Sequence, residues 1–327
     1  MLAPEVKPSE ELPKPSIDET HRQTVRKLTL FSSVPAQVLL QGFDAGFVAR
    51  PSDRNALLKM WEKASEAYNL AGNSFRSYST ADDLRVVTGV DSIRLESILK
   101  RAKQYPPYDS HPIGIYNARI SKLVTPQLAI NASRAARRAN IKPGMTNGDL
   151  LEISFQSAGK PEAITRQILG LLQTSGAVMF TSYDEDIRMY HPPQYRQIPI
   201  SEKDLQSPTY ESVCFPVGGG LPFASAFRVD LGQGSSRLIL GNGIHRVYAL
   251  AGAGYEWCPL IVCDLIPMEI SDPFVELPRD LLLGPNANPP LITDFLDDEV
   301  VIPLDYYLTL KTVRFNWNIE QYVTVLK

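Results

Sequence analysis

The chain has 327 residues, of which 44% are hydrophobic and 21% charged, a composition typical of a globular protein with one or two domains. The formal net charge of −3 gives no support to a nucleic-acid binder, because such proteins normally present a basic surface. No apolar stretch approaches the roughly 18 residues that a membrane-spanning helix needs, so we expect no membrane contact.

Cysteine usage points to a reducing compartment. The three cysteines, Cys214, Cys258 and Cys263, form no spaced pair of the kind that holds a metal, and an odd, small number argues against a disulfide framework. The first residues lack the basic-then-apolar pattern of a secretion signal. We therefore expect a cytoplasmic protein and predict no metal site.

The first hundred residues divide into a tail and a helical region. Residues 1–24 are rich in Pro, Glu, Lys and Ser and bury almost nothing, which predicts a disordered tail. Residues 25–110 are expected to form a helical N-terminal region. Its clearest helix starts at Pro51-Ser52-Asp53, carries Leu57, Leu58, Trp61 and Tyr68 at helical spacing, and ends at Gly72-Asn73.

A second helical pair is predicted between Thr80 and Lys103. Thr80 would cap a short helix through Leu84 and Val87, Gly89 would break it, and a second helix would follow. Helix, glycine turn and helix form the outline of a DNA-binding helix-turn-helix, or of a plain helical hairpin. We favour the hairpin, because the start of the second helix is not especially basic.

The middle of the chain, residues 111–265, is predicted to be an α/β domain, entered through a connection at 105–112. Helices are expected over 132–140, where Arg134, Arg137 and Arg138 are clustered, and over 161–173; a strand is expected over 177–180. The arginines could contact a phosphate, although a solvated helix face is the favoured interpretation. Residues 266–327 are expected to form a Pro-rich, β-strand C-terminal extension.

One strand, turn and helix carries the strongest chemical signal. Leu238 to Leu240 form a short apolar strand, Gly241-Asn242-Gly243 a tight turn, and a helix opens near Ile244. A helix N-terminus presents unpaired N–H groups and a partial positive charge, and glycine lets a phosphate approach the backbone. This junction therefore predicts an anion site.

The predicted phosphate-binding residues are Gly241, Asn242, Gly243, His245 and Arg246. Arg246 would offer a bidentate fork to phosphate oxygens. His245 is also the candidate catalytic residue, because imidazole can orient or protonate a phosphate oxygen. The alternative is a tight glycine turn in which His245 and Arg246 only make local pairs.

The run Leu240-Gly241-Asn242-Gly243-Ile244-His245-Arg246, with the apolar helix and strand that follow, resembles the ParB/sulfiredoxin-like superfamily over residues 195–265. The resemblance implies a small mixed α/β domain in which a glycine turn and a His-Arg pair hold nucleotide phosphates. Sulfiredoxins place a reactive cysteine immediately before that pair, and here the position is Ile244, so sulfinic-acid repair is not expected unless Cys258 or Cys263 approaches from elsewhere; buried structural thiols are the favoured interpretation of both. ParB proteins follow the domain with a helix-turn-helix, which residues 266–327 do not resemble.

The sequence therefore predicts an α+β protein that binds a nucleotide or a small phosphate-containing ligand, with ATP or CTP and Mg²⁺ as candidate cofactors. It leaves open whether the protein is an enzyme, a nucleotide-dependent phosphotransferase or hydrolase. The alternative is a non-catalytic DNA-associated or assembly scaffold; DNA is not favoured, and a protein partner or a homo-oligomer stays open. Catalysis would require a carboxylate near His245, which we expect from residues 184–211. The acidic runs at 184–186 and 294–299 are candidate Mg²⁺ ligands, although solvated loops are the favoured interpretation.

Overall fold

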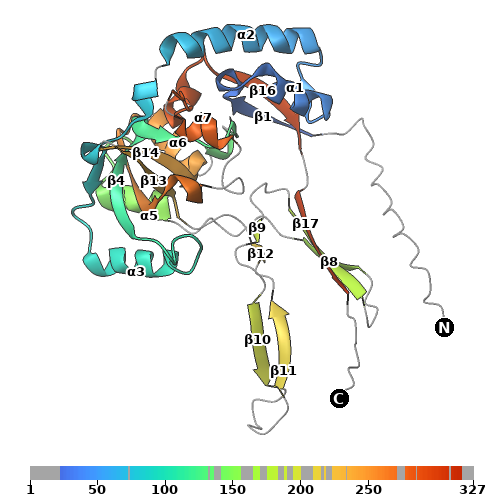
Figure 1. Ribbon diagram of the computed structural model, residues 1–327, viewed down its shortest axis with the longest axis vertical. Helices are drawn as coiled ribbons and strands as arrows, with labels where there is room; N and C mark the ends of the chain where they lie inside the picture. The colour runs from blue at the N-terminus through green and yellow to red at the C-terminus, as the bar shows by residue number, and fades with distance from the viewer. Residues whose placement is uncertain are drawn as a thin grey trace, which may run out of the picture.

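The computed structural model describes residues 23–72, 74–131, 133–135, 141–155, 165–169, 175–182, 188–189, 194–199, 209–214, 217–218, 223–232, 234–270, 277–284, 286–308 and 311–318. The fold is mixed α/β (Figure 1). The α-helices are α1 (Ala36–Asp44), α2 (Arg54–Ala71), α3 (Ser92–Ala102), α5 (Asn147–Phe155), α6 (Ile244–Gly252) and α7 (Arg279–Leu283). The strands are β1 (Thr24–Thr29), β2 (Val48–Arg50), β3 (Leu84–Val86), β4 (Ile113–Arg119), β5 (Leu123–Val124), β6 (Ala129–Ile130), β7 (Thr165–Leu169), β8 (Ser175–Ser182), β9 (Arg188–Met189), β10 (Gln194–Pro199), β11 (Thr209–Cys214), β12 (Val217–Gly218), β13 (Ser225–Gly232), β14 (Ser235–Asn242), β15 (Trp257–Leu265), β16 (Ile302–Tyr307) and β17 (Lys311–Asn318).

A six-stranded sheet forms the body of the molecule, in the order β3-β4-β15-β13-β14-β5. β13 pairs antiparallel with β14 and parallel with β15, and α6 connects the latter two strands (Figure 1). The predicted strand, glycine turn, helix and following strand therefore all form, between Ser235 and Leu265.

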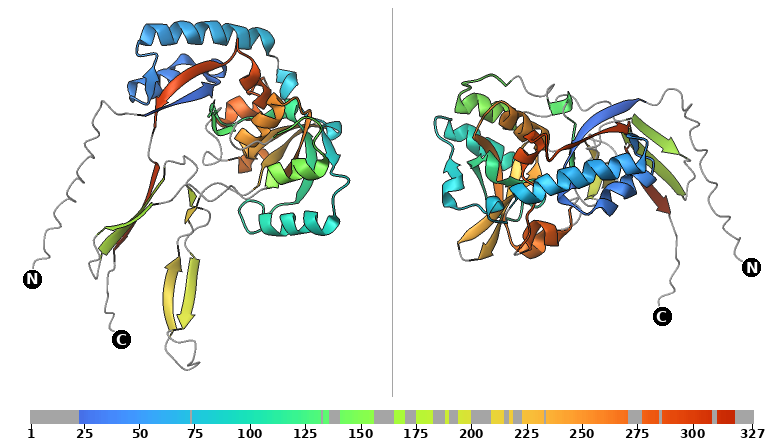
Figure 2. Two further views of the ribbon diagram at one scale, coloured as in Figure 1. Left: turned by 180° about the vertical axis from the view of Figure 1, so that it is seen from behind. Right: turned by 90° about the horizontal axis from the view of Figure 1, so that it is seen from above.

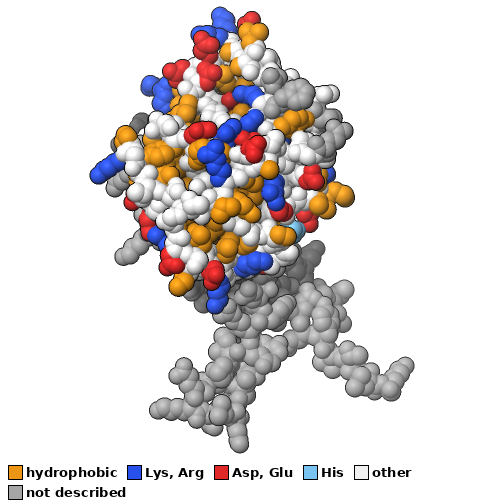
Figure 3. Space-filling model, turned by 90° about the vertical axis from the view of Figure 1, so that its left-hand side faces the viewer, with side chains coloured by type: hydrophobic (Ala, Val, Ile, Leu, Met, Phe, Trp, Pro, Cys, Tyr) orange, Lys and Arg blue, Asp and Glu red, His pale blue; other side chains and the backbone are white. Residues whose placement is uncertain are grey.

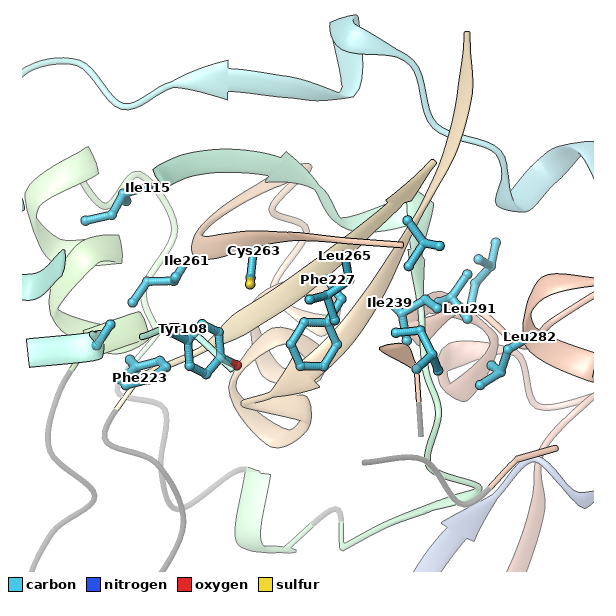
Figure 4. Close-up of a cluster of buried hydrophobic side chains, with 14 of the residues drawn as sticks. Tyr108, Ile115, Phe223, Phe227, Ile239, Ile261, Cys263, Leu265, Leu282 and Leu291 are labelled. Carbon is cyan, nitrogen blue, oxygen red and sulfur yellow. The ribbon is translucent and has the colours of Figure 1, made fainter. Parts of the chain in front are cut away.

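Two hydrophobic cores lie on the two faces of this sheet. On one face, α6 buries Ile244, Val247 and Leu250, whose spacing puts them on one side of the helix, against apolar residues of β13, β14 and β15. The other face carries aromatic side chains, among them Tyr108 and Phe227 (Figure 4). Because both faces of these central strands are covered, burial is nearly continuous along β15 and along the first part of β13, from Ser225 to Val229.

A second sheet, in the order β2-β16-β1-β6, brings the first described strand against β16 of the C-terminal region. β1 and β16 pair antiparallel over their full lengths. The helices α1 and α2 cover this sheet, through a core formed by Leu39, Leu57, Ala64, Ile302 and Leu304. The N-terminal region that we expected to be helical thus also supplies strands, and one of them pairs with the C-terminal extension.

Two of the predicted helices were wrong. Leu84–Val86 is the edge strand β3, paired with β4, and the capping box at Thr80 closes a 3-10 turn over Ala81–Asp83 instead of starting an α-helix. Pairing with β4 overrides the weak local helical signal, so the helix-turn-helix outline is not formed. Thr165–Leu169 is likewise a strand, β7, paired with β8; the apolar spacing in 161–173 suggested the helical period. α2, α3 and β8 confirm the helix expected between Pro51 and Gly72, the second helix of the predicted pair and the strand expected over 177–180. Most of the helix expected over 132–140, including Arg137 and Arg138, lies outside the described residues.

Two further β-structures project from the body in both views (Figures 1 and 2). One is the antiparallel ribbon β10-β11, and the other is the three-stranded sheet β17-β8-β7. Within the latter, the rings of Phe180 and Phe315 meet edge to face, with centroids 6.0 Å apart.

Arg237, a fully buried arginine in β14, ties that strand to the end of α7 and the segment that follows it. Its guanidinium donates to the carbonyl oxygens of Leu282, Gly284 and Ala287 and to the Ser77 hydroxyl. A buried charge is tolerated where its donors are satisfied, and these acceptors take hydrogen bonds from all three guanidinium nitrogens. β14 is thereby fixed at the end opposite to the glycine turn.

Replacing Arg237 by Met should lower the free energy of unfolding by about 3 kcal/mol, because buried carbonyls lose charge-assisted hydrogen bonds. Arg228→Met is the matched control on the neighbouring strand, since Arg228 makes a half-exposed pair with Asp264 that is worth about 1 kcal/mol or less. Urea unfolding followed by circular dichroism measures both. Equal losses in the two variants would contradict the structural role of Arg237.

Candidate functional site

Gly241 is the extra residue of a β-bulge at the end of β14. Leu240 lies opposite Ala226 and Asn242 opposite Ser225, which leaves Gly241 without a partner position on β13. A Cβ atom on Gly241 would lie 2.9 Å from the Phe227 ring and 3.1 Å from the Ser225 hydroxyl oxygen. The bulge therefore requires glycine, since the aromatic ring and the hydroxyl fill the space of a side chain.

Gly243 ends the turn and caps α6 in the left-handed region, at φ 91°. A Cβ atom there would lie 2.7 Å from the Cβ atom of Ala224, so both conformation and space select glycine. The Gly243 carbonyl accepts the N–H groups of Arg246 and Val247, at 2.9 and 3.1 Å, and so starts the helix. The first turn of α6 contains no acidic residue, which leaves the positive end of the helix dipole uncompensated within the helix.

Asn242 and His245 flank this turn and are both partly exposed. The Asn242 side-chain amide donates to the carbonyl oxygen of Phe223, which ties the turn to the start of β13. His245 Nε2 accepts the backbone N–H of Asn131 at 3.2 Å. With this bond in place Nε2 carries no proton, so the neutral imidazole has its N–H at Nδ1.

Arg246 turns inward. It is 6% exposed, and its Nη1 donates to the Ser154 carbonyl at 2.9 Å. Ser154 belongs to the last turn of α5, where an arginine stabilises carbonyls that have no partner within the helix. The Ser154 carbonyl also accepts the Ala224 N–H at 2.8 Å. Arg246 thus joins α6, α5 and the entry to β13.

The structure brings all five predicted site residues to one junction, but they divide into different roles. Gly241 and Gly243 are required by internal packing, and Arg246 holds α5. The partly exposed surface of the turn consists of the glycine backbone, Asn242 and His245. Nη1 of Arg246 already donates to the Ser154 carbonyl oxygen. A contact between Arg246 and a phosphate is not tested by the structure and stays a prediction.

Replacing Arg246 by Met should lower the free energy of unfolding by about 1.5–3 kcal/mol, since a buried charge-assisted hydrogen bond is lost. Arg94→Met is the matched control for a contact with the same helix, α5: Arg94, in α3, pairs with Glu152 of α5 at the surface, where such a pair contributes about 1 kcal/mol or less. Chemical denaturation of the variants compares the two. An Arg246 variant as stable as the wild type would show that this side chain is not a structural tie.

Sequence reasoning missed the residues that support the turn. Ser225, Phe227 and Tyr108 are all buried around Gly241, and Tyr108 comes from the segment that we read as a simple connection. The Tyr108 hydroxyl lies 2.7 Å from the Ser225 hydroxyl. The available signal was the pair Tyr105 and Tyr108, on either side of Pro106-Pro107, because aromatic side chains in a connecting segment usually pack against the core.

The carboxylate predicted near His245 stays a prediction, because most of residues 184–211 lie outside the described residues. The acidic run at 184–186 also lies outside the described residues, and its role as a source of Mg²⁺ ligands stays a prediction. In the second run, Asp294 makes a bidentate pair with Arg76, both distances being 2.8 Å, and accepts the Leu291 N–H. Burial raises the pKa of Asp294 despite this pairing. Within the described ranges, no group of three or more His, Cys, Asp or Glu residues is placed to hold a metal ion.

Cys258 and Cys263 both lie buried in β15. Burial raises the pKa of the Cys258 thiol and raises that of Cys263 to about 12. A thiol that stays protonated is a poor nucleophile, so these residues act as small apolar side chains.

A histidine–carboxylate pair fastens the segment that carries Tyr108. His111 Nε2 lies 2.9 Å from Glu269, and Nδ1 lies 3.0 Å from the Pro107 carbonyl oxygen. A ring protonated on both nitrogens can donate to both oxygens at once. The Ser110 hydroxyl lies 3.0 Å from Nδ1 and also donates to the Pro107 carbonyl oxygen at 3.2 Å. The hydrogen bonds to Glu269 and Pro107 raise the pKa of His111, with Asp109 adding to the effect, and the bond from His111 lowers the pKa of Glu269. Lys103 contacts the His111 carbonyl oxygen at 3.5 Å.

This pair makes stability depend on pH. Because the pKa of His111 is raised on folding, its contribution is complete below the ordinary value of 6.5 and is lost as the pH rises through the folded pKa. Because the pKa of Glu269 is lowered, its contribution is present above 4.5 and is lost as the pH falls through the folded pKa. The stability difference between wild type and His111→Gln should therefore be largest between these values and shrink toward pH 9, as measured by urea unfolding. A difference that grows above pH 7 would contradict the pairing.

Comparison with known proteins adds no relative. No family model matches the chain, and neither a curated protein nor a solved structure shows significant similarity to it. Among the described helices none is both long and apolar enough to span a bilayer. The ParB/sulfiredoxin-like resemblance therefore rests on residues 195–265 alone.

Proposed function

We propose that this protein binds the phosphate group of a nucleotide or another small ligand at the turn between β14 and α6. The observation that carries the proposal is the start of α6: a glycine cap at φ 91°, no acidic residue in the first turn, and a partly exposed turn surface. The first N–H groups of a helix have no partner within it and favour an anion. The resemblance of this run to ParB/sulfiredoxin-like domains supports the same site.

Binding is favoured over catalysis by the bond that His245 makes. A general base on Nε2 would need that nitrogen's lone pair, and the N–H of Asn131 occupies it. Any Mg²⁺ would arrive with the phosphates of ATP or CTP, since nucleotide-bound Mg²⁺ needs few protein ligands. A phosphotransferase or hydrolase activity is thus the second form of the proposal, and it requires a carboxylate that approaches His245.

Duplex DNA is not proposed as the ligand. The helix pair that would have read it is replaced by β3 and α3, and α3 buries Ile98 and Ala102. On the face shown in Figure 3, Lys and Arg side chains are interspersed with Asp and Glu. Such a mixed surface gives weak, unselective attraction to a polyanion.

Self-association is a second candidate function, favoured by the β-structures that project from the body (Figure 2). A two-stranded ribbon such as β10-β11 is marginally stable alone in water and gains stability against a partner. Light scattering coupled to size-exclusion chromatography of the full chain tests this. A monomer at all concentrations would remove the candidate.

A charge change at position 245 tests the phosphate site. In His245→Glu the carboxylate would stand where the anion binds, and at about 5 Å this repulsion should weaken phosphate or ATP binding about a hundredfold. The same glutamate should leave the melting temperature unchanged or raise it, because a negative charge favours a helix N-terminus. Thermal shift and calorimetry with inorganic phosphate, ATP and CTP, with and without Mg²⁺, measure both effects.

His245→Gln is the neutral control and should retain most of the binding. Wild-type protein that binds none of the three ligands would refute the proposed function. Mg²⁺-dependent phosphate release by the wild type that disappears in His245→Gln would instead favour the phosphotransferase or hydrolase form.

A further inference from the structure

Tyr108 contacts both residues against which Gly241 packs. Its ring stacks on Phe227, with centroids 6.1 Å apart and an interplanar angle of 20°. Its hydroxyl lies 2.7 Å from that of Ser225. Figure 4 shows Tyr108 beside Phe227 on the aromatic face of the sheet. Phe227 and Ser225 are the two residues whose atoms a Cβ on Gly241 would meet.

A third contact reaches the turn by another route. The Tyr108 ring meets Phe223 edge to face, with centroids 5.2 Å apart. The carbonyl oxygen of Phe223 in turn accepts the side-chain amide of Asn242. Tyr108 therefore touches residues that contact both Gly241 and Asn242, the two residues that lead from β14 into the cap of α6.

We infer that Tyr108 is a positioning residue for the phosphate site: it braces Ser225, Phe227 and Phe223 so that the bulge at Gly241 keeps one shape. This inference rests on the proposed function for its effect on binding. The brace itself follows from the packing, because a bulge breaks the regular ladder of hydrogen bonds and its conformation must be held by its neighbours.

Burial makes the brace rigid. Tyr108 is 1% exposed and Ser225 is fully buried, so water does not readily replace the bond between their hydroxyls. Without the tyrosine hydroxyl, Ser225 would lose this partner and would gain by turning toward other polar groups of the turn. The turn would then sample several conformations, of which one fits an anion.

The test uses Tyr108→Phe in the full chain, which keeps the ring and removes the hydroxyl. Hydrogen exchange of the peptide covering 238–244 should become about tenfold faster, while exchange of β16, in the other sheet, stays near the wild-type rate. Affinity for inorganic phosphate or ATP should fall by a similar factor. Tyr105→Phe is the matched control, since Tyr105 lies in the same segment and its ring packs against Phe223 at 6.0 Å.

The double variant Tyr108→Phe/Ser225→Ala separates positioning from a general loss of stability. Tyr108→Phe and Ser225→Ala each remove the same bond between the two hydroxyls. The double variant should therefore exchange no faster at 238–244 than Tyr108→Phe alone. The inference is overturned if hydrogen exchange in Tyr108→Phe becomes faster by the same factor in 238–244 and in β16, or does not become faster in 238–244. Wild-type protein that binds no phosphate defeats the proposed function, while the exchange measurement still decides whether Tyr108 holds the bulge.

Discussion

The close approach of β14 to β13 at the glycine turn is the constraint on which the rest of the site depends. Gly241 lies against Phe227 and Ser225, and Gly243 lies against Ala224, so the chain leaves the sheet along a single path. That path sets where α6 begins and therefore which residues of its first turn face the solvent or the core. His245 stays partly exposed, and Arg246 is directed to α5.

Arginine side chains connect this junction to segments that are distant in the sequence. Arg237 holds the start of β14 against the carbonyls that follow α7, and Arg246 holds α6 against Ser154. Both guanidinium groups therefore donate hydrogen bonds to carbonyl oxygens inside the protein. The attraction of the turn for an anion would then come from backbone N–H groups and the helix dipole, which depend on shape more than on any one side chain.

The sequence was most informative where the signal is local. The strand, glycine turn and helix from Leu238 to Leu250 follow from apolar spacing and from glycine, and all of them form. Leu84–Val86 was misread because its strand exists only through pairing with β4, a partner more than 25 residues away. The inward course of Arg246 and the brace from Tyr108 depend on contacts across 92 and 117 residues, which no local pattern encodes.

The account is tested most directly by titrating inorganic phosphate into uniformly labelled protein and following backbone amide resonances. A phosphate held by the start of α6 should move the amide signals of Gly243, Ile244 and His245 in a saturable way, with chloride as the matched control. Signals from β16, in the other sheet, should stay in place. Saturable shifts confined to other parts of the chain, or no shift at residues 243–245 at millimolar phosphate, would contradict the central claim.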